Sequence, residues 1–119
     1  MPPSASEGAA SDAGPLMALG TLDGLDSLAR LFRRTLVAQA VLDECLAWPT
    51  PAIRAAADMG LFKVQASEPI AETALGPGKR SAIALAQAHG ALLLADDRAA
   101  RRYAKAAGLR VVGIQRKSL

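Results

Sequence analysis

The sequence has 119 residues, of which 51% are hydrophobic and 3% aromatic, and its formal net charge is +3. This length predicts a single domain whose core is built mainly from aliphatic side chains. The single cysteine, Cys45, excludes an internal disulfide bond and a cysteine-rich zinc cluster. No apolar run reaches the roughly 18 residues of a membrane span, and no signal-peptide pattern opens the chain. We therefore expect a cytoplasmic protein with no membrane partner.

The first half of the chain predicts short helices around a buried strand. Residues 1–10 belong to a stretch rich in Ala, Ser, Gly and Pro, which predicts a flexible N-terminal segment followed by one domain over residues 11–119. Leucines then recur at helical spacing and predict one or two helices, with one face formed by Leu25, Leu28, Leu31 and Phe32. The elements predicted next are a strand over 35–39, a helix over 40–48, a helix over 51–59 and a strand over 61–65.

The second half alternates helices and strands more clearly. Glycines and prolines predict a loop over 66–78, and the apolar residues that follow predict a helix over 79–89. The run ALLLA over 91–95 is continuously apolar, as expected of a parallel strand that is buried on both faces. A helix over 98–107 and a strand over 109–114 complete the pattern. This alternation predicts an α/β fold in which helices cover a parallel sheet.

Basic side chains gather on one side of the predicted helix 98–107. At helical spacing, one stripe contains Arg98, Arg101, Arg102 and Lys105, and another stripe is apolar. A basic patch of this kind suits a polyanion such as RNA, or an acidic protein partner. The simpler interpretation is a solvated helix face, which charge alone favours.

Four acidic residues are predicted to lie where strands end. Asp96 and Asp97 follow the most apolar strand, Glu44 lies one turn into the helix after the strand 35–39, and Asp12 joins them if a strand precedes it. Ligands of parallel α/β sheets collect outside the carboxyl ends of the strands. Carboxylates gathered there need a cation, and Mg²⁺ or Mn²⁺ prefers such oxygen ligands and can activate water against a phosphodiester. The alternatives are a helix N-cap for either aspartate and a solvated position for Glu44.

Several segments resemble the PIN-domain family, in a branch of predicted nucleic-acid-binding proteins. The stretch LGPGKRSAIALAQAHGALLLADDRAARRYAKAAGLRVVGI over 75–114 is similar to the second half of that branch. Its pattern has a loop ending in Gly-Glu, a helix with an Ala-Ile-x-Leu-Ala core, and a strand running into two acidic residues. Upstream, SDAGPLMALGTLDGLDSLARLF resembles the opening of the family, and VAQAVLDEC resembles the segment that supplies a helical glutamate. The likeness covers residues 11–114.

The resemblance implies a three-layer PIN-like fold and a Mg²⁺- or Mn²⁺-dependent ribonuclease, many relatives being toxins of toxin–antitoxin pairs of the VapC type. By position it makes Asp12, Glu44 and Asp96 the catalytic metal ligands, with Asp97 a further ligand or a supporting group. Arg101 matches an arginine that binds the RNA backbone or pairs with the acids. The partners implied are RNA and either an antitoxin protein or a second copy of the chain, docked through leucines between residues 16 and 32.

Two departures from the family pattern point to an impaired site. Lys79 stands where Gly-Glu places a glutamate, so an ammonium can neutralise the carboxylates in place of a metal ion. The residues before Asp12, EGAAS, lack the large aliphatic side chains of the family's first strand. The alternative to a ribonuclease is therefore a catalytically inactive PIN-fold module that binds RNA or a protein partner.

Overall fold

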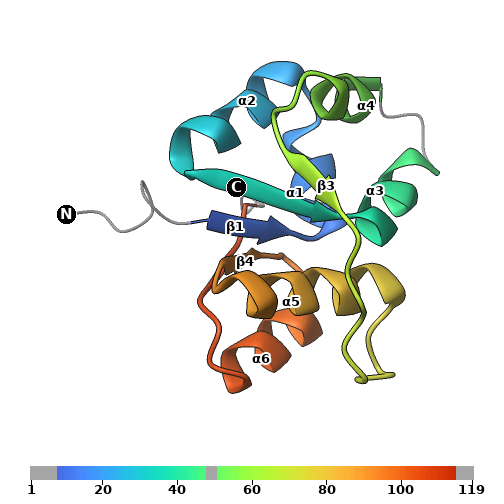
Figure 1. The fold of residues 1–119 in the computed structure, drawn as a ribbon, viewed down its shortest axis with the longest axis vertical. Helices are drawn as coiled ribbons and strands as arrows, with labels where there is room; N and C mark the ends of the chain where they lie inside the picture. The colour runs from blue at the N-terminus through green and yellow to red at the C-terminus, as the bar shows by residue number, and fades with distance from the viewer. Residues whose placement is uncertain (1–7, 48–50, 115–119) are drawn as a thin grey trace, which may run out of the picture.

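The computed structural model describes residues 8–47 and 51–114, which form a parallel five-stranded sheet with helices on both faces (Figure 1). The strands lie in the order β3-β2-β1-β4-β5. Their bounds are β1 (Gly8–Ser11), β2 (Arg34–Ala38), β3 (Lys63–Gln65), β4 (Leu92–Leu94) and β5 (Val111–Val112). The helices are α1 (Ala13–Leu19), α2 (Leu22–Leu31), α3 (Gln39–Leu46), α4 (Pro51–Asp58), α5 (Pro77–His89) and α6 (Arg98–Ala106).

The helices form two layers around the sheet, which confirms the predicted three-layer α/β fold. Helices α5 and α6 cover one face, and α1, α2 and α4 lie on the other (Figure 1). Helix α5 packs along the central strands β1 and β2, while α3 contacts both α1 and α5 near the carboxyl ends of the strands. None of the helices within the described ranges is long and apolar enough to cross a membrane.

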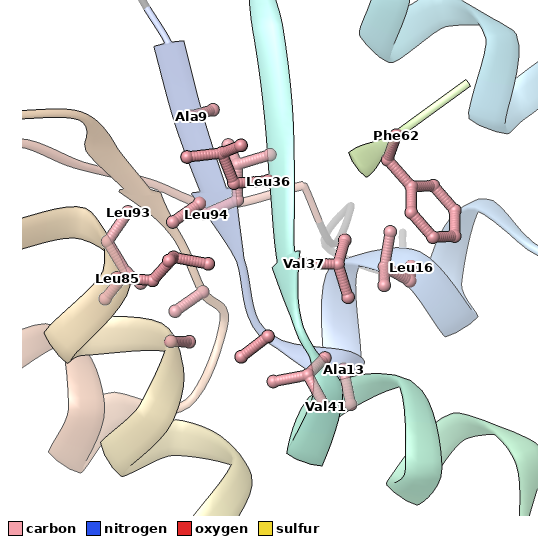
Figure 2. Packing of buried hydrophobic residues seen from close by; sticks show 14 of the residues in the cluster. Ala9, Ala13, Leu16, Leu36, Val37, Val41, Phe62, Leu85, Leu93 and Leu94 are labelled. Carbon is pink, nitrogen blue, oxygen red and sulfur yellow. The ribbon is translucent and has the colours of Figure 1, made fainter. Parts of the chain in front are cut away.

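The central strand β1 contains no large aliphatic side chain and yet is among the most buried strands. Residues 8–10, which composition placed in the flexible segment, belong to β1, where Ala9 and Ala10 have no exposed surface. Ala10 pairs with Leu36 on one side and with Leu93 on the other. Figure 2 shows large aliphatic side chains from neighbouring elements around β1. The alanines are buried because their neighbours supply the bulk, a tertiary effect that composition does not carry.

Helix α2 turns most of its predicted apolar face inward. Leu25 and Leu28 are fully buried and Phe32 nearly so, whereas Leu31 is 50% exposed, so Leu31 does not share the face of the other three as predicted. Leu31 is the last helical residue and lies beside the stripe formed by the other three. Leu16 is also fully buried, so Leu16, Leu25 and Leu28 form core and offer little surface for an antitoxin or a second copy, whereas Leu31 is half exposed.

We predict that Ala10→Leu destabilises the protein by about 1–3 kcal/mol, because the extra carbons must be forced between two packed neighbours. Chemical denaturation measures this as a lower transition midpoint. Ala29→Leu, on the exposed side of α2, is the matched control and should change the midpoint little. Equal midpoints for the two variants would contradict the tight packing of β1.

Candidate functional site

The four predicted acidic residues lie at one edge of the sheet. Asp12 follows β1, Asp96 and Asp97 follow β4, and Glu44 lies in the helix that follows β2. Because all strands are parallel, their carboxyl ends meet at this edge. The predicted placement at the sheet edge is therefore confirmed, and the contacts of each side chain determine what the group can do.

Asp12 is the buried member of the group. It sits between β1 and α1, and its backbone N–H donates to the carbonyl of Leu94 over 2.9 Å, which ties it to β4. The residue is 2% exposed, and its Oδ1 atom has no hydrogen-bond partner among the described residues. The Nζ atom of Lys79 lies 3.7 Å from the other oxygen, Oδ2. The ammonium of Lys79 is thus the cation that balances this carboxylate.

The protonation of Asp12 reflects this environment. Its pKa is raised above the ordinary 3.8, chiefly because burial disfavours the charged form. The Ala13 amide and the Lys79 ammonium oppose the shift, whereas the carboxylate of Asp97 adds to it. The carboxylate of Asp97, after β4, is therefore close enough to Asp12 to affect its pKa.

Glu44 reaches the start of α5. A Cβ atom built on Gly78 would lie 2.7 Å from Glu44 Oε1, so the carboxylate rests against the glycine backbone and any side chain there would displace it. Burial, followed by the charges of Glu44 and Asp12, raises the pKa of the neighbouring Cys45 thiol to about 11. The thiol therefore stays protonated at neutral pH and is a poor metal ligand.

Asp97 and Asp96 have different local roles. Asp97 caps α6, because its Oδ2 atom accepts from the backbone N–H of Ala100 over 2.9 Å. Asp96 turns toward β5, where its Oδ1 atom accepts from the backbone N–H of Ile114 over 2.8 Å. The capping alternative thus holds for Asp97, whereas Asp96 ties the end of β4 to the segment after β5.

Arg101 joins this second arrangement. Its Nη1 atom donates to the carbonyl of Ala95 over 3.0 Å. A Cβ atom on Gly113 would lie 2.7 Å from Arg101 Nη1 and 2.8 Å from Asp96 Oδ1. The absence of a side chain at Gly113 therefore allows both groups to approach the backbone. Sequence reasoning missed the need for glycine at Gly113 and Gly78, since both contacts join residues far apart in the chain.

The residues at this edge meet the needs of a divalent ion only in part. The unpartnered Oδ1 of Asp12 suits a cation ligand. Against this, the Lys79 ammonium lies beside the same carboxylate, and no three His, Cys, Asp or Glu side chains in the described ranges are close enough to share an ion. The donor set does not fit an ion held by three acidic groups. Metal binding by Asp12, Glu44, Asp96 and Asp97 stays a prediction.

The basic stripe lines a hollow beside the acidic edge. A hollow of about 340 Å³ is bounded by Asp96, Arg98, Arg101, Arg102 and Lys105. Arg98, Arg102 and Lys105 are exposed, and Arg101 is partly buried because of its bond to Ala95. The predicted stripe thus has a concave surface, which is more than a uniformly solvated helix face provides.

Comparison with known proteins agrees with this architecture. A family model described as a PIN domain matches residues 9–115. The chain belongs to the PIN-domain family. A PilT N-terminus domain protein from the hyperthermophilic archaeon Sulfolobus solfataricus has a similar structure, with a TM-score of 0.63 and 19% identity over 90% of this chain and 87% of that chain. A search of curated proteins finds no significant match.

Membership of the PIN-domain family indicates a general class of function. PIN domains are typically nucleases, generally use divalent metal ions and commonly bind nucleic acid. The resemblance drawn from the sequence is therefore confirmed for family and fold. In this PIN domain the Asp12 carboxylate after β1 forms an ion pair with the Lys79 ammonium. Any function assigned to this edge has to be compatible with that ion pair.

We predict that Asp12→Asn becomes increasingly stabilising, relative to the natural protein, as pH rises above 3.8. A raised pKa means that the folded protein binds this proton more tightly than the unfolded chain does. The natural protein therefore loses stability as pH rises from the ordinary pKa of 3.8 to the raised pKa of the folded state. The variant lacks the titrating group and avoids the loss. Free energies of unfolding measured from pH 3 to pH 7 test this. If the stability advantage of Asp12→Asn shrinks with rising pH, the favourable contact between Lys79 and the charged Asp12 outweighs the cost of burying that charge.

Proposed function

We propose that this PIN domain binds nucleic acid, with RNA as the expected ligand, and that Lys79 takes the place of a metal ion in balancing its acidic edge. The observation that carries the proposal is the 3.7 Å separation between Lys79 Nζ and Asp12 Oδ2. Activity as a hydrolase is weak or absent in this proposal, which corresponds to the inactive module that Lys79 suggests from sequence.

Electrostatic magnitudes favour the ammonium over a divalent ion. At an effective dielectric constant of about 20, two unit charges about 4 Å apart interact by about 4 kcal/mol, so a dication near Lys79 is repelled by about 8 kcal/mol. The ammonium is covalently attached to α5 and is present at every ion concentration. A divalent ion at Asp12 would have to bind beside the Lys79 ammonium, which is 28% exposed and lies 3.7 Å from Oδ2, and it would be repelled unless Lys79 moved away.

The position of Lys79 in its helix supports a specific role for the pair. Lys79 lies in the first turn of α5, which contains no acidic residue. A cation there opposes the helix dipole, at a cost of about 0.3–1 kcal/mol, whereas a glutamate would be stabilised. The contact with Asp12 offsets that cost. The charge of Lys79 thus stabilises the Asp12 carboxylate and does not stabilise the helix.

The expected contact with RNA is electrostatic. Arg98, Arg102 and Lys105 are exposed around one hollow on α6, and Arg101 faces the same hollow. Arginine and lysine bind phosphate oxygens and release counterions, which makes affinity depend on salt rather than sequence. This hollow adjoins Asp96, so a bound backbone would lie beside the acidic edge.

A second candidate is the Mg²⁺- or Mn²⁺-dependent ribonuclease that the family resemblance suggests, acting in the cytoplasm as the toxin of a toxin–antitoxin pair. One observation favours it: the buried Oδ1 of Asp12 lacks a hydrogen-bond partner in the described part of the chain. It requires Lys79 to leave the carboxylate. An antitoxin partner or a homodimer belongs to this candidate and rests on the family alone.

We predict that Lys79→Glu creates Mn²⁺ affinity at least about 100-fold above that of the natural protein, because repulsion is replaced by a third carboxylate. Titration calorimetry with Mn²⁺ measures the change. Lys79→Met is the control that removes the ammonium without adding an acid, and it should gain less. Tight Mn²⁺ binding by the natural protein, with RNA cleavage that Asp12→Asn abolishes, would favour the second candidate instead.

We also predict that Arg98→Gln/Arg102→Gln weakens binding of a single-stranded RNA and lowers the salt dependence of log K by about 1.4, since each lost phosphate contact contributes about 0.7. Fluorescence anisotropy at several salt concentrations measures both effects. Arg54→Glu on α4 changes the net charge by the same two units at an exposed position and serves as the control. Equal losses in both variants would mean that net charge alone attracts RNA.

A further inference from the structure

A second basic hollow lies at the opposite edge of the sheet from the acidic residues. Its volume is about 460 Å³, and its lining includes Arg33, Arg34 and His89 around Gly8 and Ala91. Gly8 begins β1, Arg34 begins β2, and Ala91 immediately precedes β4. Because these strands are parallel, the hollow lies at their amino ends, separate from the acidic edge and from the hollow on α6.

The charge in this hollow is unbalanced. Arg33 and Arg34 are exposed, and within the described ranges neither guanidinium has a carboxylate partner. No acidic side chain is among the described lining residues. His89 is engaged with a neutral side chain, since its Nε2 atom lies 2.9 Å from Nε2 of Gln65. The two arginines therefore supply the positive charge.

The hollow continues along the sheet. A neighbouring hollow of about 210 Å³ shares Gly90 and Ala91 with it and extends past the end of α6 to Arg110, next to β5. The two hollows adjoin at Gly90 and Ala91 and follow the amino ends of β2, β1, β4 and β5, with arginines at both ends. We call this surface, from Arg33 and Arg34 to Arg110, the amino-edge trough. Its elongated shape suits a chain of charges better than one small anion.

One electrostatic effect opposes an anion here. Helix α5 ends at His89, so the negative end of its dipole, worth about half an elementary charge, faces this edge. The backbone carbonyls of Ala86 and Gln87 accept from the N–H of Gly90, and Ala86 also accepts from Ala91, which reduces their exposure to a ligand. Two full charges from Arg33 and Arg34 exceed this partial charge, so the edge remains attractive to anions.

We propose that the amino-edge trough binds the phosphodiester backbone of single-stranded nucleic acid, so that one strand contacts both this edge and the α6 surface. The inference rests on the proposed function, because it assigns a second contact to the same RNA. An acidic peptide would need apolar or aromatic anchors to bind stably. The described lining consists mainly of glycines, arginines and one histidine, and its side chains Leu36, Ala91 and Leu92 are buried. Among these lining residues, Leu109 is the apolar side chain that is partly exposed, which is less than an anchored peptide needs. Phosphate contacts require no such anchors.

The test measures binding of the full chain to a fluorescein-labelled 20-nucleotide RNA by anisotropy at several salt concentrations. Arg33→Gln/Arg34→Gln should weaken binding about 25-fold near 0.1 M salt and lower the salt slope by about 1.4, as expected for two lost phosphate contacts. Arg54→Glu is the control with the same charge change, and thermal unfolding shows whether each variant is folded. Equal affinities for the two variants would overturn the trough.

The outcomes separate this inference from the proposed function. If Arg98→Gln/Arg102→Gln weakens binding but Arg33→Gln/Arg34→Gln behaves as the control does, the α6 surface binds RNA and the trough does not. No binding by the natural protein overturns both. A polyglutamate peptide of matched charge serves as the alternative probe. If it binds as tightly as RNA and depends equally on Arg33 and Arg34, the trough is a site for an acidic protein and the inference is wrong.

Discussion

The buried carboxylate of Asp12 is the constraint around which the acidic edge is organised. It is 2% exposed, at the junction of β1 and α1, and its backbone N–H is bonded to β4. An uncompensated charge in such a place costs several kcal/mol, so a cation or a proton must accompany it. Lys79 supplies the cation from the first turn of α5, while Glu44 lies against the preceding residue, Gly78. These two contacts link α1, α3 and α5 to the central strand.

Compensation by a side chain rather than an ion changes what the edge can do chemically. A bound dication can activate water and stabilise charge on phosphate, whereas an ammonium can only attract and orient an anion. The thiol of Cys45, with its pKa raised to about 11, adds no nucleophile at neutral pH. Asp96 and Asp97 are already engaged with Ile114 and Ala100. These contacts agree with the proposed role of this edge, which is recognition of phosphate by the basic groups around it.

The sequence predicts those helices and strands whose own side chains form a clear apolar pattern. The apolar run of β4 and the two-sided pattern of α6 are found within a residue or two of their predicted positions. Strand β1 was not predicted, because its alanines are small and are buried by larger residues on the neighbouring strands, such as Leu36 and Leu93. Composition alone does not show such contacts. At the site, the acids could be named in advance because topology places strand ends together, and Lys79 because the family resemblance places a glutamate at its position. The turn of Asp96 toward Ile114 could not, since it depends on contacts with Gly113 and Arg101 across the fold.

The first turn of α5 shows why the charges of such a site are hard to predict from helix preferences alone. Lys79 and Arg80 both oppose the helix dipole there, and each is held by a distant partner: Lys79 by Asp12, and Arg80 through a 2.8 Å bond from Nε to the carbonyl of Ile70. A glutamate at position 79 would suit the dipole but would place a further carboxylate near Asp12 and Glu44, and that cluster would demand an external cation. Local helix stability and neutrality of the edge therefore make opposite demands on one residue. In this chain neutrality prevails, because the desolvation cost of a buried charge exceeds the small gain from a helix dipole.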